Sequence, residues 1–201
     1  MNSPSDTPAG RRLAALVLAA GSASRFGSDK LSAPLEGSPL LFHAIRAARA
    51  APVDRVIVVA RPDLAIGQWQ DGPAIETVRV TSTALSTSLQ AGVKAAGDVD
   101  GLFVFLGDMP RVPHAQAGRL VALIGANRAA LPRCAGRPGH PVLLDARAFP
   151  EIALLTGDRG AGALLKTWPD VVYDECEDPT VLIDVDHPAD LNALTGTAAS
   201  H

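Results

Sequence analysis

Apolar residues along the first hundred positions follow two alternating patterns. Uninterrupted apolar runs, which are typical of strands buried on both faces of a sheet, occupy 13–19, 56–60 and 101–106. A weaker alternation predicts a further strand at 74–80. Between these runs, apolar residues spaced three and four apart predict helices at 39–51 and 86–96. Strands and helices that alternate in this way predict an α/β domain built on a doubly wound parallel sheet.

The second half of the chain is less regular. Helical spacing occurs at 115–124, 160–167 and 188–194. Short apolar stretches predict strands at 128–131, 142–144, 171–173 and 181–185. We therefore expect one domain over 13–194, with short tails at 1–12 and 195–201.

Composition narrows the class of protein. The 201 residues are 47% hydrophobic with a net charge of −3, which excludes a disordered chain. Eighteen basic against 21 acidic residues exclude a strongly basic nucleic-acid-binding surface. No apolar run has the length of a membrane span, and the first twelve residues lack an apolar signal-peptide core, so we expect a cytoplasmic protein. Cys134 and Cys176 are too few for a disulfide framework.

The first predicted strand leads into a loop of small residues that runs from Leu18 to Lys30. Ligands of open α/β sheets bind at the carboxyl ends of the strands, where small residues let backbone N–H groups approach phosphate oxygens. Arg25 and Lys30 add two cations that suit a triphosphate. The alternative is an ordinary turn with two solvated cations. The loop matches neither a P-loop nor a dinucleotide-binding fingerprint.

Acidic residues follow two other predicted strands. Asp108 comes directly after 101–106, where it is suited either to ligate Mg²⁺ or to cap the next helix. Asp184 and Asp186 belong to the last predicted strand region, and alternation places both on one side of it, so either is a candidate second ligand. Asp186 also precedes Pro188, which makes a helix cap the alternative for this residue.

Six motifs in chain order resemble those of one enzyme family. They are Leu18-Ala19-Ala20-Gly21-x-x-x-Arg25-x-Gly27-x-x-Lys30, Ser86-Thr87-Ser88-Leu89-x-Ala91-Gly92, Leu106-Gly107-Asp108-Met109-Pro110, Gly136-x-x-Gly139-His140-Pro141-Val142, Gly157-Asp158-x-Gly160-Ala161 and Asp184-Val185-Asp186-x-Pro188. The set resembles the nucleotidyltransferases that load nucleotides onto molybdenum cofactor, and among them the molybdenum cofactor cytidylyltransferases.

The resemblance implies both a fold and a reaction. The fold would be Rossmann-like, a mostly parallel sheet flanked by helices, of the nucleotide-diphosphosugar transferase type. The reaction would be a Mg²⁺-dependent transfer of CMP from CTP to a molybdopterin-type cofactor with release of pyrophosphate, with Mn²⁺ as a substitute metal. CTP is implied because the Ala-Ala-Gly form of the first motif resembles that of members using pyrimidine nucleotides. Transient contact with a molybdoenzyme or its chaperone would follow from this acceptor, and no nucleic acid or membrane partner is expected.

The resemblance also assigns roles by residue. Arg25, Lys30 and Asp108 are the expected catalytic residues, and Asp108 and Asp186 the expected metal ligands. The expected nucleotide-binding residues are Leu18, Ala19, Ala20, Gly21, Arg25, Lys30, Ser82, Ser86, Ser88, Gly107 and Asp108.

The remaining roles concern the acceptor and the aromatic residues. His140 and Asp158 are expected to contact the acceptor, although His140 equally suits a histidine that fixes its loop. A helix cap is the alternative for the serines of the second motif. Trp69, Trp168 and Tyr173 are expected to pack in the core or in loops rather than to stack on a base.

Among the departures from the pattern are two missing arginines, because Pro138 and Gly162 stand where the family commonly has arginine. Such losses would change phosphate or pterin contacts and leave the nucleotide chemistry intact. The alternative acceptor is therefore a sugar phosphate or another phosphorylated metabolite. A third hypothesis, a nucleotide-binding module without turnover, is opposed by the charged residues that the motifs retain.

Overall fold

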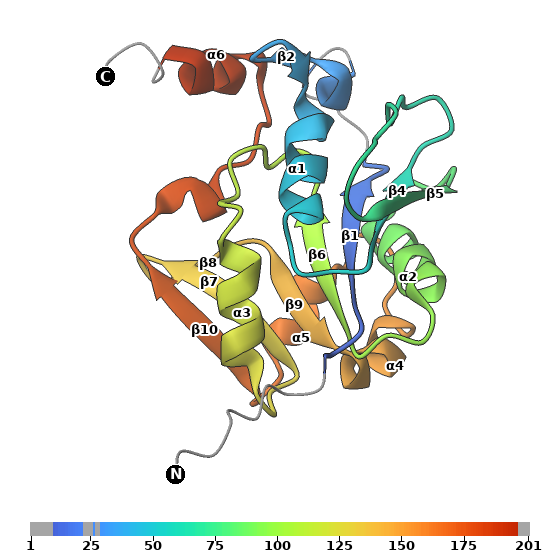
Figure 1. Cartoon of the computed structure of the whole chain (residues 1–201), viewed down its shortest axis with the longest axis vertical. Coiled ribbons are helices and arrows are strands. Elements are labelled where there is room, and N and C mark those ends of the chain that lie inside the picture. Colours follow the sequence, from blue (N-terminus) through green and yellow to red (C-terminus); the bar gives the residue numbers. More distant parts are fainter. Residues whose placement is uncertain (1–9, 22–25, 27–28, 197–201) are drawn as a thin grey trace.

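A mixed sheet runs through the middle of the part of the chain that the computed structural model describes, residues 10–21, 26 and 29–196 (Figure 1). Its strands are β1 (Leu13–Ala19), β4 (Arg55–Ala60), β5 (Ala74–Arg79), β6 (Gly101–Leu106), β7 (Ala129–Cys134), β8 (Arg137–Pro138), β9 (Val142–Asp145) and β10 (Val171–Cys176). A separate hairpin consists of β2 (Pro34–Leu35) and β3 (Ser38–Pro39). The α-helices are α1 (Leu40–Arg49), α2 (Leu85–Ala96), α3 (Gln116–Ile124), α4 (Phe149–Ile152), α5 (Ala161–Leu165) and α6 (Pro188–Gly196). Three short 3₁₀ helices are η1 (Lys30–Ser32), η2 (Ala146–Ala148) and η3 (Pro179–Leu182).

The strands follow the order β10-β7-β9-β6-β1-β4-β5, and β8 pairs with β7. β1 lies between β4 and β6 and is parallel to both, with Leu16 beside Ile57 and Val104. β9 runs antiparallel to β6 and to β7. The mostly parallel sheet is therefore confirmed, with one strand of its long path reversed.

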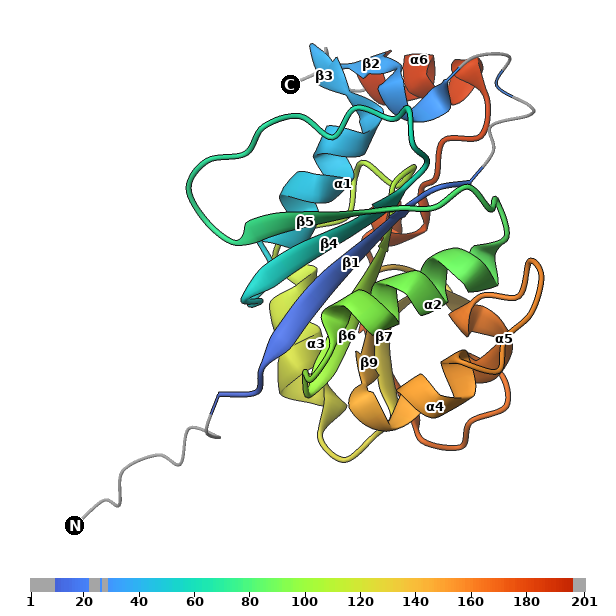
Figure 2. The ribbon, with the colours of Figure 1, turned by 90° about the vertical axis from the view of Figure 1, so that its right-hand side faces the viewer.

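The two faces of the sheet carry separate cores. Ala15 and Val17 of β1 face the core that holds α1 and α3, whereas Ala14 and Leu16 face the core that holds α2, α4 and α5. Figure 2 shows the two groups of helices on opposite sides of the strands. β1 is buried along nearly its whole length, as its uninterrupted apolar run predicts.

Most predicted elements are confirmed with ends shifted by up to three residues, but the strand predicted at 181–185 is wrong. The stretch begins inside η3, where Asp178 Oδ1 accepts hydrogen bonds from the backbone N (2.9 Å) and the hydroxyl (2.6 Å) of Thr180. Val181 and Val185 are each fully buried. The apolar pattern therefore comes from a loop that buries two separate valine side chains rather than from a strand.

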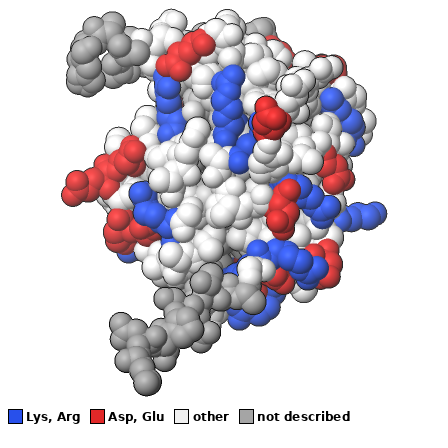
Figure 3. Space-filling view, in the orientation of Figure 1, with Lys and Arg blue, Asp and Glu red and all other residues white. Residues whose placement is uncertain are grey.

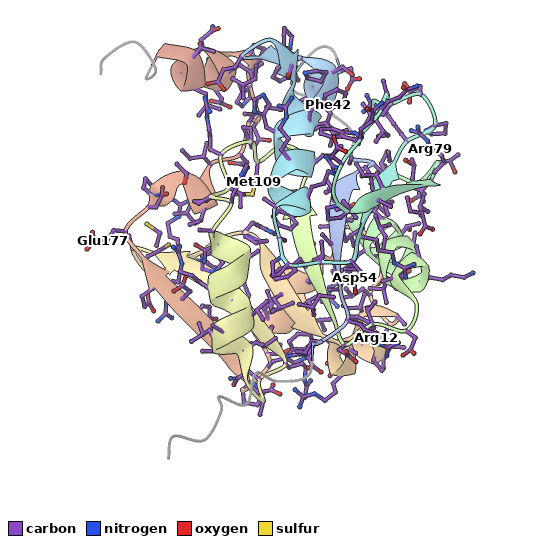
Figure 4. All side chains as sticks on the ribbon, viewed as in Figure 1. Arg12, Phe42, Asp54, Arg79, Met109 and Glu177 are labelled. Atoms are coloured by element: carbon purple, nitrogen blue, oxygen red, sulfur yellow. The ribbon has the colours of Figure 1, made fainter. Side chains whose placement is uncertain are left out.

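The edges of the sheet differ in their chemistry. Arg12 and Asp54, labelled in Figure 4, precede β1 and β4 and so lie at the amino edge, where Arg12 pairs with Asp98 at 3.0 Å. On the face shown in Figure 3, basic and acidic side chains are interspersed. Within the described ranges, no helix has both the length and the apolar character needed to cross a membrane.

Candidate functional site

The candidate site lies at the carboxyl edge of the sheet, where β1 and β6 end side by side. The N–H of Gly107 donates to the carbonyl of Leu18 at 2.9 Å. A Cβ on Gly107 would lie 3.0 Å from that oxygen and 3.1 Å from Leu41 Cδ1, so glycine permits this close approach. Met109, labelled in Figure 4, is buried on the same loop. The approach places Asp108 directly beside the end of β1.

Lys30, Asp108 and Asp186, from three distant parts of the sequence, meet at this edge. Lys30 Nζ donates to Asp108 Oδ2 at 2.8 Å and to Asp186 Oδ1 at 3.2 Å. The lysine side chain is 12% exposed, against 26% for Asp108 and 50% for Asp186. Burial lowers the pKa of Lys30, but the two carboxylates outweigh this and hold the pKa above its usual value. A charged ammonium therefore joins the two acids that the sequence singled out.

A second ion pair fixes the turn that carries Lys30. Arg61, directly after β4, pairs with Asp29, and the Asp29 carboxylate also accepts a hydrogen bond from the hydroxyl of Ser32. Burial raises the pKa of Asp29, but Arg61 and Ser32 outweigh it and hold the pKa below its usual value. Leu31, inside η1, is buried. Sequence reasoning missed this positioning pair, although the place of Arg61 at a strand end was an available signal.

The last loop of the chain is fixed against Asp108 by backbone hydrogen bonds. Val185 N donates to Asp108 O at 3.0 Å. Asp190 Oδ2, in α6, accepts from the backbone N of Asp186 and of His187 at 2.9 and 2.7 Å. These bonds hold the pKa of Asp190 below its usual range. Asp190 is therefore a second positioning residue that the motifs did not indicate.

A divalent metal fits the two carboxylates. Asp108 and Asp186 already converge on a positive charge, the ammonium of Lys30. Within the described ranges, no group of three or more His, Cys, Asp and Glu residues is arranged to hold a metal. One or two carboxylates completed by water and substrate phosphates is the arrangement typical of Mg²⁺. The alternative that Asp108 caps the next helix is wrong, because the N-cap of α3 is Ala115, without a side-chain cap.

The small-residue loop runs from the core to the surface. Leu18 is half-buried, Ala19 and Ala20 are buried, and Gly21 is exposed. A Cβ on Gly21 would meet no atom of the described residues within 4 Å. Arg25 lies outside the described residues, and its role stays a prediction.

The serines near the start of α2 bind the protein backbone. Ser86 and Ser88 are each 3% exposed. Ser86 Oγ donates to Gly157 O at 2.7 Å, and Ser88 Oγ donates to Ala84 O at 3.4 Å. The cap alternative is wrong, because the N-cap of α2 is Ala84, without a side-chain cap. Ser82, in the preceding loop, accepts from Ala84 N at 3.2 Å. Contact of these serines with a nucleotide stays a prediction.

His140 is fixed by the backbone and borders two recesses. Its backbone N–H donates to Val181 O at 2.9 Å, and its ring Nδ1 lies 3.3 Å from Val104 O. Burial lowers the pKa of His140, so the ring is neutral near pH 7. With Nδ1 donating to the carbonyl, Nε2 is the hydrogen-bond acceptor of the ring. Asp184 lines the smaller recess of about 190 Å³ beside His140, whereas Asp186 is the acid that faces Lys30.

The second recess is an apolar pocket of about 300 Å³ between the sheet and helices α2 and α5. We call it the α2–α5 pocket. Leu18 and Leu106, at the ends of β1 and β6, line it, so it adjoins the loop that carries Asp108. Pro138 and Gly162, the two positions that depart from the family's pattern, also line it.

The structure also places four other residues that the sequence singled out. Asp158 is exposed on the turn before α5 and is not among the residues that line the pocket. Trp168 is buried, and Trp69 packs against Phe42 with ring centroids 5.2 Å apart, so the packing expectation is confirmed for both. Tyr173 packs against the core as expected and also lines the pocket, which the sequence did not indicate.

Gly139 is expected to be essential to the placement of His140. A Cβ at Gly139 would lie 2.5 Å from the carbonyl oxygen of Val181, which is backbone and cannot rotate away. Gly139→Ala should therefore lower the free energy of unfolding by about 1–3 kcal/mol, measured by urea denaturation. The control is Gly162→Ala, whose Cβ would meet nothing within 4 Å in a helix and should not destabilise. Equal stability of the two variants would show that the turn does not contact η3 as described.

Comparison with known proteins places the chain among nucleotidyltransferases. The purine catabolism protein PucB of Bacillus subtilis is 28% identical over 196 residues, which cover 90% of this chain and 95% of PucB. A 2-C-methyl-D-erythritol 4-phosphate cytidylyltransferase of Dechloromonas aromatica is 39% identical over 118 residues, 54% of this chain and 51% of that protein. A probable molybdenum cofactor guanylyltransferase of Pyrococcus furiosus is 34% identical over 95 residues, 47% of this chain and 46% of that protein.

Solved structures and a family model give the same result. A homologue of Rv0371c from Mycobacterium sp. strain JC1 superimposes with a TM-score of 0.79 at 27% identity, covering 92% of this chain and 98% of that chain. Rv0371c of Mycobacterium tuberculosis H37Rv in complex with manganese has a TM-score of 0.73 at 25% identity, covering 92% and 99%. Residues 15–189 match the model of the MobA-like NTP transferase domain. The chain thus belongs to the family of MobA-like NTP transferase domains and is a nucleotidyltransferase.

Proposed function

We propose that this protein transfers CMP from CTP to a molybdopterin-type cofactor and releases pyrophosphate, with Mg²⁺ or Mn²⁺ held by Asp108 and Asp186. The observation that carries the proposal is the Lys30 ammonium between those two carboxylates, at strand ends beside a loop of small residues. The edge thereby offers a cation for a triphosphate and oxygens for the metal that accompanies it. Passage of the product to a molybdoenzyme or its chaperone belongs to the same proposal.

The chemistry needs little from the protein beyond position and charge. An acceptor phosphate oxygen attacks the α-phosphorus of CTP, a new P–O bond forms, and the bond to pyrophosphate breaks. A phosphate monoester is largely ionised near pH 7, so the reaction needs no general base. Lys30 would neutralise the triphosphate, and the backbone of residues 18–21 would hold the nucleoside. A bound divalent metal would polarise phosphate oxygens and stabilise the departing charge.

The choice of CTP and acceptor rests on sequence and relatives. The Ala-Ala-Gly form of the first motif supports a pyrimidine nucleotide, and the name of the Pyrococcus relative supports molybdenum cofactor as acceptor. The Dechloromonas relative is named for a polyol phosphate, 2-C-methyl-D-erythritol 4-phosphate. That compound is the competing acceptor and belongs in the same assay.

The test is release of pyrophosphate from CTP, GTP, UTP or ATP with Mg²⁺ or Mn²⁺. Each nucleotide is paired with no acceptor, molybdopterin-type cofactor, 2-C-methyl-D-erythritol 4-phosphate or a sugar 1-phosphate. We expect release from CTP that depends on the molybdopterin-type cofactor and on the metal. Release from GTP would overturn the choice of base, and release with a polyol or sugar phosphate would overturn the choice of acceptor. Binding of CTP without release under any condition would favour a nucleotide-binding module.

A further inference from the structure

The walls of the α2–α5 pocket are almost entirely apolar. Side chains from the sheet and from α2 form them, among which are Leu85, Leu89, Val104 and Leu131. Gly160 closes the pocket toward α5, because a Cβ there would lie 2.5 Å from Leu85 Cδ2. The start of α5 therefore lies close against α2 at this point.

One wall is an aromatic ring that the protein holds in place. Tyr173 lines the pocket, and the guanidinium carbon of Arg133 lies 4.2 Å from the centroid of its ring. Arg133 is in turn paired with Glu175 on the neighbouring strand. A ring fixed in this way offers a flat ligand a surface for stacking without further ordering.

Among the residues that line the pocket, Lys166 is the one that carries a full charge near pH 7, since His140 is neutral. Lys166 is exposed, and within the described ranges it makes no hydrogen bond or ion pair. It follows Gly162 by four residues, so the two lie on the same side of the α5 segment. Lys166 therefore faces the space that an arginine at position 162 would otherwise enter.

We propose that the α2–α5 pocket holds the body of the acceptor and selects a flat, largely uncharged ring whose outer edge carries an oxygen for Lys166 to bind. Lys166 is then a specificity-determining residue. A polyol would place several hydroxyl groups in a pocket whose lining offers few polar partners besides His140, Tyr173 and Lys166, so polyol phosphates are selected against. The inference rests on the proposed function for the orientation of the acceptor, whose phosphate would lie toward Asp108 and whose ring would lie toward α5.

Direct binding tests the pocket without turnover. The probe is pterin-6-carboxylate, a flat fluorescent ring with an edge carboxylate, titrated against the full chain. Lys166→Met should weaken binding about tenfold through loss of a charge-assisted hydrogen bond. Lys94→Met, at an exposed lysine of α2 outside the pocket, should bind as the unchanged protein does. Gly162→Arg, at a position where an added Cβ would meet nothing within 4 Å, adds a second cation at the pocket and should bind more tightly. Equal affinities of the two methionine variants, or displacement of the probe by 2-C-methyl-D-erythritol 4-phosphate, would overturn the inference.

Turnover separates this inference from the proposed function. In the pyrophosphate assay, Lys166→Met should raise KM for the molybdopterin-type acceptor about tenfold and leave KM for CTP unchanged. An unchanged acceptor KM would overturn the pocket assignment while the transferase stands. Probe binding that depends on Lys166, without pyrophosphate release by any pairing, would support the ring-binding pocket and overturn the proposed function.

Discussion

Asp108→Asn is expected to lower kcat for pyrophosphate release about a hundredfold or more, on the order of 3 kcal/mol in the barrier. Asparagine keeps the volume of the side chain and an oxygen that can accept from Lys30. It removes the negative charge that a divalent metal needs. The loss should therefore appear in kcat at saturating CTP and metal rather than in folding.

The matched control is Asp54→Asn, an exposed aspartate at the opposite edge of the sheet (Figure 4). Its kcat should equal that of the unchanged protein, and urea denaturation should show that both variants are folded. If Asp108→Asn turns over within twofold of the control, Asp108 does not hold the metal.

Lys30→Met is expected to have two effects of opposite sign. The value of kcat/KM for CTP should fall about a hundredfold, since the ammonium is a preorganised, largely buried charge that is proposed to neutralise the triphosphate. Binding of Mn²⁺ in the absence of nucleotide should become tighter, because the ammonium no longer competes for Asp108 and Asp186. Electron paramagnetic resonance of free Mn²⁺ measures the second effect independently of activity.

Two variants provide the controls. Lys30→Arg keeps the positive charge and should leave Mn²⁺ binding close to that of the unchanged protein, and Lys94→Met should change neither quantity. If Lys30→Met binds Mn²⁺ no more tightly, the metal does not share the carboxylates that the lysine occupies. If kcat/KM is unchanged, Lys30 does not contact the triphosphate.

The meeting of Lys30 and Asp108 could be predicted from the sequence, because both residues are positioned by the ends of parallel strands. Lys30 and Asp108 are 78 residues apart, yet both follow runs that are buried on two faces, and parallel strands bring their carboxyl ends to one edge. For the second acid, the alternation left Asp184 and Asp186 both open, and the family resemblance favoured Asp186. In the structure, Asp186 is positioned by Asp190 and by the bond from Val185 N to Asp108 O, contacts that the alternation did not indicate.

The parts that were not predicted depend on long-range pairing. Strand β8 consists of two exposed residues without an apolar pattern, so it was not predicted. The apolar pattern of β9 is no different from that of a parallel strand, so its direction was not readable. The loop at 181–185 has strand-like spacing because two valines, Val181 and Val185, are each buried in the protein at separate points of the loop. The α2–α5 pocket is assembled from seven separate segments, and its charge, Lys166, belongs to none of the motifs.

The reversed strand β9 has a consequence for how such proteins diversify. Because it runs against β6, the residues that enter it, Gly139 to Pro141, arrive at the same edge as the residues that leave β1 and β6. Lys30 and Asp108 thus come from the first 108 residues, and most of the pocket lining comes from residues 131–173. If the pocket holds the acceptor as proposed, we expect substitutions in residues 131–175 to exchange one acceptor for another while Lys30 and Asp108 stay unaltered.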